Sequence, residues 1–534
     1  MIDRVRAVPW WARALLGLAV GAAGGMAFMV GSWALTIGCV AALSMLVLPA
    51  PSWWQAALTG FCFGLTQYLL GVTWLSVIFV EALFGLAALE ACFSALLAVL
   101  LRWSGRTPWW PPLAAGCWLA VEYAFSHFPF EGFPWLRLGY LSVDSPLAGL
   151  LPLVGVPGAT FALALAGQFV AWAVLVGDGP TQWVRGLAGV VAVLCTGLLG
   201  LLVPAGAETG SVSVGYVQGN APGGGIYGLG EARTITRNHV AETQRLAGRI
   251  ESGELPRPDF VVWPENGTDM DPFADAQTNA LVKQAVAAVG VPVLIGTITD
   301  GPGVDERQTA AIVWDPATGA QARYDKRNLV PFGEWVPLRS ILEPLFPVVR
   351  YVGAQSVPGT GPGVLPIDLG ERVVTVGDLI CYEVAYDATV HDTVRAGAQL
   401  SVVQSSNAMY VGTGQVAQQF RITRARAAEL RRDILVVTTT GTSGLIRPDG
   451  SVAFTLPEFE AASGVVELPL RSGLTPAVLV SGWLELAGIA VTVLGLAVVL
   501  WRRRGDTAGA QPAQGHHSGR VRQNGQSEAN QETQ

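Results

Sequence analysis

The residues with the clearest capacity for chemistry in this sequence are one cysteine, one glutamate and one lysine. Cys381 follows the apolar run VVTVGDLI, Glu265 follows DFVVWP, and Lys326 closes the run ARYDK. In α/β domains, ligand-facing residues collect at the ends of strands. A thiol at a strand end can act as a nucleophile if a carboxylate takes its proton and a compact cation stabilises the oxyanion. The three residue types therefore indicate covalent catalysis at a cysteine.

Composition singles out two of these residues. Cys381 is the only cysteine outside the long apolar segments, so it has no obvious disulfide partner. All 33 basic residues except Lys283 and Lys326 are arginines, which indicates that a retained lysine has a task arginine cannot perform. Lys283 lies in a helical pattern and is expected to be solvated. The other cysteines all lie in apolar segments: Cys39, Cys62, Cys92, Cys117 and Cys195.

Each residue also has an ordinary interpretation that the sequence leaves open. Cys381 could be a buried strand residue, Glu265 a surface or capping residue, and Lys326 a surface ion-pair partner. Histidine is the more usual base for a cysteine, but the polar part of the chain between the last two apolar segments offers only His239 and His391. We expect His239 on the surface of its helix and His391 directed away from the strand end that carries Cys381.

The apolar segments predict an integral membrane protein. Of the 534 residues, 51% are apolar and 14% are charged, with a net charge of −7; no basic patch suggests nucleic acid. Arginines before the first span and after the fourth, sixth and eighth would all face the same, cytoplasmic side. Eight spans are predicted, two within 14–51 and the others at about 55–79, 82–101, 112–127, 157–176, 184–203 and 482–501.

This topology predicts four parts. Residues 1–204 form a membrane domain of about seven helices, 205–481 a domain outside the cytoplasm, 482–501 a last span, and 502–534 a polar, disordered cytoplasmic tail. Both termini would be cytoplasmic. Within 205–481, strand patterns alternate with helix patterns at 231–252 and 273–289, and a hairpin turns at 318–319. This alternation predicts a layered α/β fold.

Several motifs carry a resemblance to known families. WPE, DKRNLVPFGE and LICYE resemble, in order and spacing, the Glu–Lys–Cys motifs of the nitrilase superfamily, which implies an αββα sandwich. The eight-span frame, with GFPWLRLGY (132–140), YVQGN (216–220) and RITRARAAEL (421–430), resembles the bacterial apolipoprotein N-acyltransferase family over roughly residues 10–500.

The resemblance implies roles for particular residues. Cys381 would be the nucleophile, Glu265 the general base and Lys326 an oxyanion stabiliser, with the backbone N–H of Tyr382 as a second donor. Other positions that match the family near its active site are Glu334, Tyr382, Glu383 and Trp135, and Tyr227 stands where the family has a tryptophan.

The implied activity is transfer of a fatty acyl chain from a phospholipid, through a cysteine thioester, to the α-amine of a diacylglyceryl-cysteine apolipoprotein. It implies a location in the bacterial inner membrane and no metal or cofactor. Loop 337–349 is expected to contact the bilayer, with a core-packing arm as the alternative. The glycine-rich 221–230 is expected to form a lid, with a plain linker as the alternative. Two alternatives remain: a membrane-tethered amidase, and a transporter or assembly protein whose Glu81, Glu90 and Glu122 line a pathway.

Overall fold

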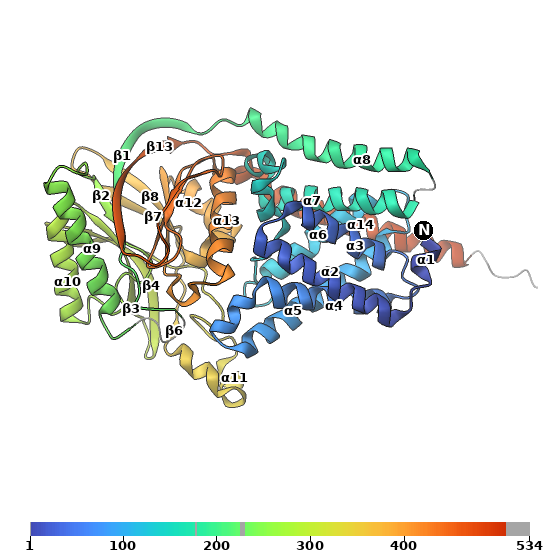
Figure 1. Ribbon diagram of the computed structural model, residues 1–534, viewed down its shortest axis with the longest axis horizontal. Helices are drawn as coiled ribbons and strands as arrows, with labels where there is room; N and C mark the ends of the chain where they lie inside the picture. The colour runs from blue at the N-terminus through green and yellow to red at the C-terminus, as the bar shows by residue number, and fades with distance from the viewer. Residues whose placement is uncertain (1, 177–178, 225–229, 509–534) are drawn as a thin grey trace, which may run out of the picture.

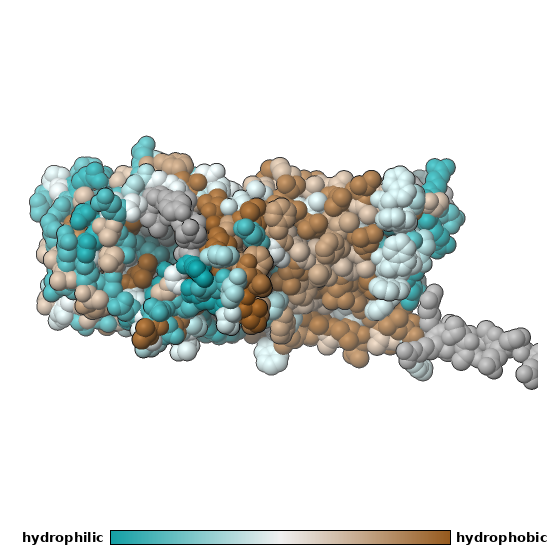
Figure 2. Space-filling view, turned by 90° about the horizontal axis from the view of Figure 1, so that it is seen from below, coloured by the Kyte–Doolittle hydropathy of each residue, from teal (hydrophilic) through white to brown (hydrophobic). Residues whose placement is uncertain are grey.

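The protein consists of a bundle of apolar helices joined to a two-sheet α/β sandwich (Figure 1). A computed structural model describes residues 2–176, 179–224 and 230–508. Figure 2 shows apolar surface over most of the helical half and mainly polar surface over the sandwich. This contrast agrees with a helical half that has lipid rather than water as its solvent.

A helix occupies each of the eight segments predicted to span the membrane. Five helical stretches in the described chain are long and apolar enough to cross a bilayer, namely Trp10–Val30, Val80–Ser104, Ala148–Val176, Pro180–Leu202 and Pro476–Arg502. The helices are α2 (Trp10–Val30), α3 (Trp33–Val47), α4 (Trp53–Gly71), α5 (Val80–Ser104), α6 (Trp110–His127), α7 (Leu151–Val176), α8 (Pro180–Cys195) and α14 (Pro476–Ala508).

Glycines bring α2 and α4 into close contact. A Cβ added to Gly21 would lie 2.0 Å from the carbonyl oxygen of Phe63, and one added to Gly17 would lie 2.7 Å from that of Thr59. Lipid tails are as apolar as leucine side chains, so the hydrophobic effect does not hold helices together in a bilayer. Close packing does so instead, and small residues such as glycine allow the two backbones to approach.

The sandwich contains two facing sheets. The strands of the first run in the order β13-β1-β2-β3-β4-β5, with β6 paired to β4, and those of the second run β12-β11-β10-β9-β8-β7. The first-sheet strands are β1 (Ala207–Gln218), β2 (Phe260–Val262), β3 (Val293–Asp300), β4 (Glu306–Asp315), β5 (Gly319–Asp325), β6 (Gln355–Ser356) and β13 (Ala462–Ser472). The second-sheet strands are β7 (Val364–Asp368), β8 (Val373–Ile380), β9 (Leu400–Ser405), β10 (Ile434–Thr438), β11 (Gly444–Ile446) and β12 (Val452–Thr455).

Helices cover both outer faces, which gives the predicted αββα layers. Helices α9 (Thr234–Glu251) and α10 (Ala276–Val289) lie outside the first sheet, and α12 (Asp387–Arg395) and α13 (Gly414–Leu430) lie on the side of the second sheet that faces the helical bundle (Figure 1). Buried side chains such as Val214, Phe260 and Val402 pack between the sheets. Helix α13 therefore lies between the second sheet and the bundle, where it can contact both.

The hairpin predicted at 318–319 is confirmed, since β4 and β5 pair antiparallel and Gly319 has a φ of 82°. The strand predicted to end at Glu265 is shorter than expected. It ends at Val262, and Glu265 lies three residues beyond it, because Pro264 has no N–H to continue the ladder.

Candidate active site

The structure brings Glu265 and Lys326 into direct contact. Lys326, the residue after β5, donates from Nζ to Oε1 of Glu265 at 2.8 Å. A second carboxylate, Glu334, accepts from the same ammonium at 2.9 Å. Lys326 is 1% exposed and Glu265 3%. The surface alternatives for both residues are therefore wrong.

Backbone donors fix both carboxylates. The N–H of Ser406 donates to Oε2 of Glu265 at 2.9 Å, and the N–H of Val330 donates to Oε2 of Glu334 at 2.7 Å. Burial alone would lower the pKa of Lys326, but the two carboxylates outweigh it and hold that pKa well above its ordinary value. Lys326 is thus a fixed cation with a lasting positive charge, as oxyanion stabilisation requires.

Cys381 lies at the sharp turn between β8 and a 3₁₀ helix, Cys381–Ala385. Its φ is 56°, in the left-handed region that non-glycine residues seldom adopt. Such strained positions are concentrated at active sites. Burial raises the pKa of the Cys381 thiol, the charge of Glu265 raises it further, and Lys326 only partly opposes them. The thiol is therefore protonated at neutral pH, and Glu265 and Glu334 are the carboxylates whose charges act on it.

Glu383 joins the segments that carry Cys381 and Lys326. Its carboxylate accepts the backbone N–H of Ile380 at 2.7 Å and of Arg327 at 2.6 Å, and the hydroxyl of Tyr324 at 2.7 Å. These bonds join the turn that carries Cys381 to the loop that follows Lys326. Glu383 is thus a supporting residue.

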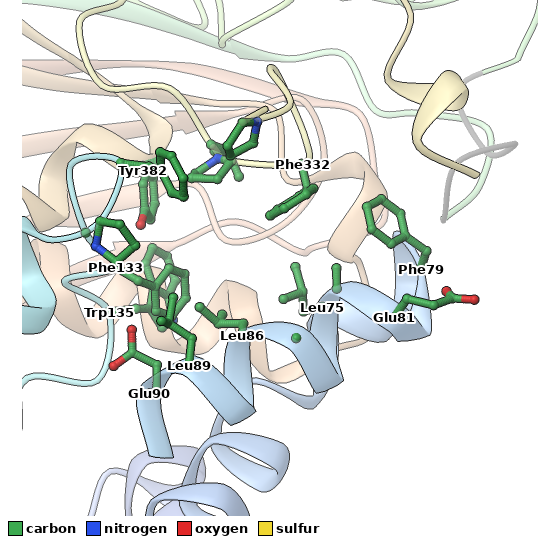
Figure 3. Close-up of a pocket in the computed structure, with 18 of the residues that line it drawn as sticks. Leu75, Phe79, Glu81, Leu86, Leu89, Glu90, Phe133, Trp135, Phe332 and Tyr382 are labelled. Carbon is green, nitrogen blue, oxygen red and sulfur yellow. The ribbon is translucent and has the colours of Figure 1, made fainter. Parts of the chain in front are cut away.

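An apolar cavity of about 370 Å³ reaches Cys381. Its volume lies within the range of ordinary ligand pockets. One wall comes from α5 and the preceding 3₁₀ turn, and the opposite wall from the sandwich and residues 128–135 (Figure 3). The apolar lining includes Trp74, Leu75, Phe79, Leu86, Leu89, Phe133 and Phe332.

Aromatic rings form part of the wall that includes residues 128–135, next to Cys381. Trp135 stacks on Tyr382, with ring centroids 5.7 Å apart and planes at 23°, and Phe133 lies 6.1 Å from the same tyrosine (Figure 3). Trp135 also contacts Trp74 edge to face at 5.5 Å. The side chains of Trp135 and Tyr382 therefore shape the cavity.

Side chains from two of the sequence motifs converge on the segment that follows Cys381. In GFPWLRLGY, the guanidinium of Arg137 donates to Asp387 at 2.7 Å, and the hydroxyl of Tyr140 donates to the carbonyl of Ala385 at 2.8 Å. In RITRARAAEL, Arg426 donates to the carbonyl of Val384 at 2.7 Å. Both motifs thus hold the segment that follows Cys381.

The glutamines of α13 were not among the residues predicted from the sequence. Oε1 of Gln418 accepts the indole N–H groups of Trp74 at 2.9 Å and Trp135 at 2.8 Å, while its Nε2 donates to the carbonyl of Gly71 at 2.7 Å. The signal available in the sequence was QVAQQF, in which three amides recur at i, i+3 and i+4 on one helix face.

The remaining candidate residues have mixed outcomes. His391 lies 3.2 Å from Glu429, and no hydrogen bond between His391 and Cys381 is found in the described part of the chain. His239 is fully buried against Trp263, so its prediction as a surface residue is wrong; the helix face it shares with Val240 packs on the first sheet.

The carboxylate of Glu122 accepts hydrogen bonds from the side chains of Arg137 and Thr160. A carboxylate engaged in this way does not fit an open pathway. Tyr227 and half of the predicted lid, residues 225–229 of 221–230, lie outside the described residues.

The segment expected to contact the bilayer exposes apolar side chains. Helix α11 (Arg339–Leu345) projects from the sandwich near the bundle (Figure 1). Leu338, Ile341, Leu345 and Phe346 are 45–66% exposed. Leu342 lines the cavity from the same helix.

Two family models match this chain, and together they describe a class of membrane enzymes with a carbon–nitrogen hydrolase domain. Residues 257–473 match the carbon-nitrogen hydrolase family, and residues 17–169 match the apolipoprotein N-acyltransferase N-terminal domain. An amidase of the nitrilase superfamily from Nesterenkonia has a TM-score of 0.37 and 16% identity, with coverage of 51% of this chain and 95% of that one.

Full-length relatives narrow the class to one family. An apolipoprotein N-acyltransferase of Mycolicibacterium smegmatis is 33% identical over 466 residues, which cover 82% of this chain and 77% of that protein. That of Azotobacter vinelandii is 30% identical over 537 residues, which cover 95% of this chain and 98% of that protein. The chain belongs to the apolipoprotein N-acyltransferase family.

Proposed function

We propose that this protein transfers a fatty acyl chain from a membrane phospholipid to the α-amine of the N-terminal S-diacylglyceryl-cysteine of apolipoproteins. The observation that carries the proposal is the apolar cavity that lies along α5 and reaches Cys381, beside the Glu265–Lys326 pair. An acyl chain can lie in such a cavity with its ester at the thiol. A small, polar amide would leave most of this lining without a partner, which disfavours the amidase alternative.

The first half-reaction forms the thioester. Glu265 takes the proton of the Cys381 thiol, and the sulfur attacks the ester carbon of the phospholipid. Lys326 and the backbone N–H of Tyr382 stabilise the tetrahedral oxyanion. The C–O bond breaks, the leaving alkoxide takes the proton from Glu265, and lysophospholipid departs.

The second half-reaction forms the amide. The neutral α-amine of the apolipoprotein attacks the thioester carbon, and Glu265 accepts a proton from the nitrogen. The C–S bond breaks, and the proton passes to the sulfur, which restores the thiol of Cys381. Since a thiolate is a better leaving group than an alkoxide, the thioester is a suitable intermediate for this ping-pong sequence.

The proposed topology follows from the position of the arginines. Residues 1–204 form the membrane domain, 205–481 the catalytic domain outside the cytoplasm, and 482–501 the last of eight spans of the inner membrane. The two termini, including 502–534, are cytoplasmic. The exposed apolar face of α11 supports contact with the outer surface of the bilayer.

Intact mass spectrometry of the protein purified from membranes tests the central intermediate. We expect a mass gain of one fatty acyl chain that hydroxylamine removes, because thioesters are labile to that nucleophile. Cys381→Ser should carry no hydroxylamine-labile acyl group. Cys195→Ser is the matched control, since Cys195 is exposed on α8, and it should keep the adduct. Absence of any adduct after incubation with phospholipid would exclude acyl transfer through a thioester.

A further inference from the structure

Helix α13 presents three buried glutamines to the candidate active site. Gln415, Gln418 and Gln419 are 3–4% exposed, and their spacing places them on one face of the helix. Gln418 is fully engaged with the tryptophans and Gly71. The other two amides form a separate chain of hydrogen bonds.

This chain runs past the catalytic thiol. Nε2 of Gln415 donates to Oε1 of Gln419 at 2.8 Å, Nε2 of Gln419 donates to the hydroxyl of Ser405 at 3.0 Å, and that hydroxyl donates to Asn407 at 2.8 Å. Sγ of Cys381 lies 4.0 Å from Oε1 of Gln419. Each amide along the chain is therefore oriented by the next one.

One end of the chain lacks a partner. Oε1 of Gln415 is buried and has no hydrogen-bond partner among the described residues, although Gln415 lines the cavity that reaches Cys381. Leaving a buried carbonyl oxygen without a donor is costly, and such groups in native structures call for a functional reason. An amide oxygen can only accept. Because Gln415 lines the cavity, a hydrogen-bond donor on a bound ligand can satisfy this oxygen.

The two proposed substrates differ in what they can supply. The ester of the acyl donor carries only acceptor oxygens at the reacting atoms, so it cannot satisfy Gln415. The amine of the acyl acceptor carries N–H groups on the attacking nitrogen itself. We propose that Gln415 is a binding residue for the acceptor amine, whose N–H donates to Oε1 of Gln415 during the second half-reaction.

This inference rests on the proposed function and deepens it by assigning a recognition residue to the amine. Because Gln419 holds the Nε2 end of the Gln415 amide, the oxygen is held in place before the amine arrives, and little ordering is needed on binding. A hydrogen bond to one N–H of the amine leaves its lone pair free to attack the thioester carbon. Oε1 of Gln415 therefore accepts a hydrogen bond from the substrate in the transfer step and receives none in the acylation step.

The test measures the two half-reactions separately on the full chain in detergent micelles. Thioester formation is followed by intact mass after adding phospholipid, and transfer by loss of that adduct after adding a synthetic diacylglyceryl-cysteine peptide. We expect Gln415→Leu to acylate within about twofold of the wild-type rate and to transfer about tenfold more slowly, the effect of one lost hydrogen bond. Gln415→Glu keeps an acceptor oxygen but, like the leucine variant, loses the N–H bond to Gln419.

The outcomes separate the possibilities. Faster transfer by Gln415→Glu than by Gln415→Leu supports a direct contact with the amine. Equal slowing in both variants would assign the effect to the lost contact with Gln419 and overturn the proposal, as would wild-type transfer by Gln415→Leu or a parallel loss of both half-reactions. Gln168→Leu, at a buried glutamine of α7, is the control and should change neither rate. A wild-type protein that never forms the adduct would instead overturn the proposed function.

Discussion

The backbone N–H of Arg327 donates to the carboxylate of Glu383 at 2.6 Å, across 56 residues of sequence. Arg327 directly follows Lys326, and Glu383 lies two residues after Cys381. One buried carboxylate thus sets the separation between Lys326 and Cys381. The proposed catalysis depends on that separation, because an oxyanion must lie next to both groups.

Replacing Glu383 with glutamine should weaken both stability and activity. The amide would turn an NH₂ group toward at least one of the backbone N–H donors, which would be left buried and unsatisfied. We expect a loss of about 1–3 kcal/mol in the free energy of unfolding, seen as a lower Tm in detergent, and a lower rate of thioester formation. An unchanged Tm with unchanged acylation would contradict this supporting role.

Replacing Lys326 with arginine should abolish most activity although the charge is kept. The ammonium fits between Glu265 and Glu334 at 2.8 and 2.9 Å in a buried site, and the larger guanidinium fork cannot occupy that position without displacing them. We expect thioester formation to slow about 100-fold or more. Lys283→Arg, at an exposed position of α10, is the matched control and should react normally. Retained activity in Lys326→Arg would show that no compact cation is required.

Replacing Gln418 with leucine should disturb the acyl-binding wall. Both indole N–H groups of Trp74 and Trp135 would lose their shared acceptor, so the aromatic wall beside Tyr382 would no longer be held. We expect a higher KM for phospholipid in the acylation step, about tenfold for the lost bonds. Unlike Gln415→Leu, this variant should transfer an acyl group already on the enzyme at close to the wild-type rate. The opposite pattern would assign Gln418 to the acceptor.

Replacing Ile341 or Leu345 with aspartate should weaken access to lipids in a bilayer. Both side chains are exposed on α11 next to the cavity, and a charge there disfavours insertion into the apolar boundary. We expect a higher KM for phospholipid in vesicles and an unchanged rate with a short-chain ester dissolved in detergent. Val304→Asp, which alters a residue that is 94% exposed in the β3–β4 turn, should behave as wild type in both assays. Equal effects in vesicles and detergent would argue for a packing role of α11.

Stability should fall in mild acid because of His239. Burial lowers the pKa of His239 to about 4 from an ordinary 6.5. The unfolded chain therefore binds a proton that the folded chain rejects, so stability is complete above pH 6.5 and declines as the pH falls toward 4. We expect about 2 kcal/mol less stability at pH 5 than at pH 7.5 from this group.

Thermal unfolding in detergent across this pH range checks the prediction. His239→Phe keeps an aromatic ring against Trp263 but cannot titrate. The decline between pH 6.5 and 4 should therefore be smaller in this variant, whatever its absolute Tm. A decline of the same size would place the responsible group elsewhere.

The sequence by itself determined the elements and the chemical types at the site. Local patterns predicted the eight helical segments, the alternating strands and helices, and the hairpin at 318–319. Residue type and a family resemblance singled out Cys381, Glu265 and Lys326, and the structure brings Lys326 and Glu265 together. These features could be read because hydrophobic periodicity, turn residues and short motifs are all local in sequence.

The tertiary structure alone decided which side chains meet. His239 was predicted on a surface, because its neighbours in sequence are polar, yet the sheet buries it. The spacing in QVAQQF places Gln418 on a polar helix face but does not reveal its partner Trp74, which is 344 residues away in the sequence. The free acceptor of Gln415 was equally invisible, since satisfaction of a hydrogen bond is a property of the packed environment rather than of the residue. Long-range packing, which no local pattern encodes, assembled the cavity that reaches Cys381.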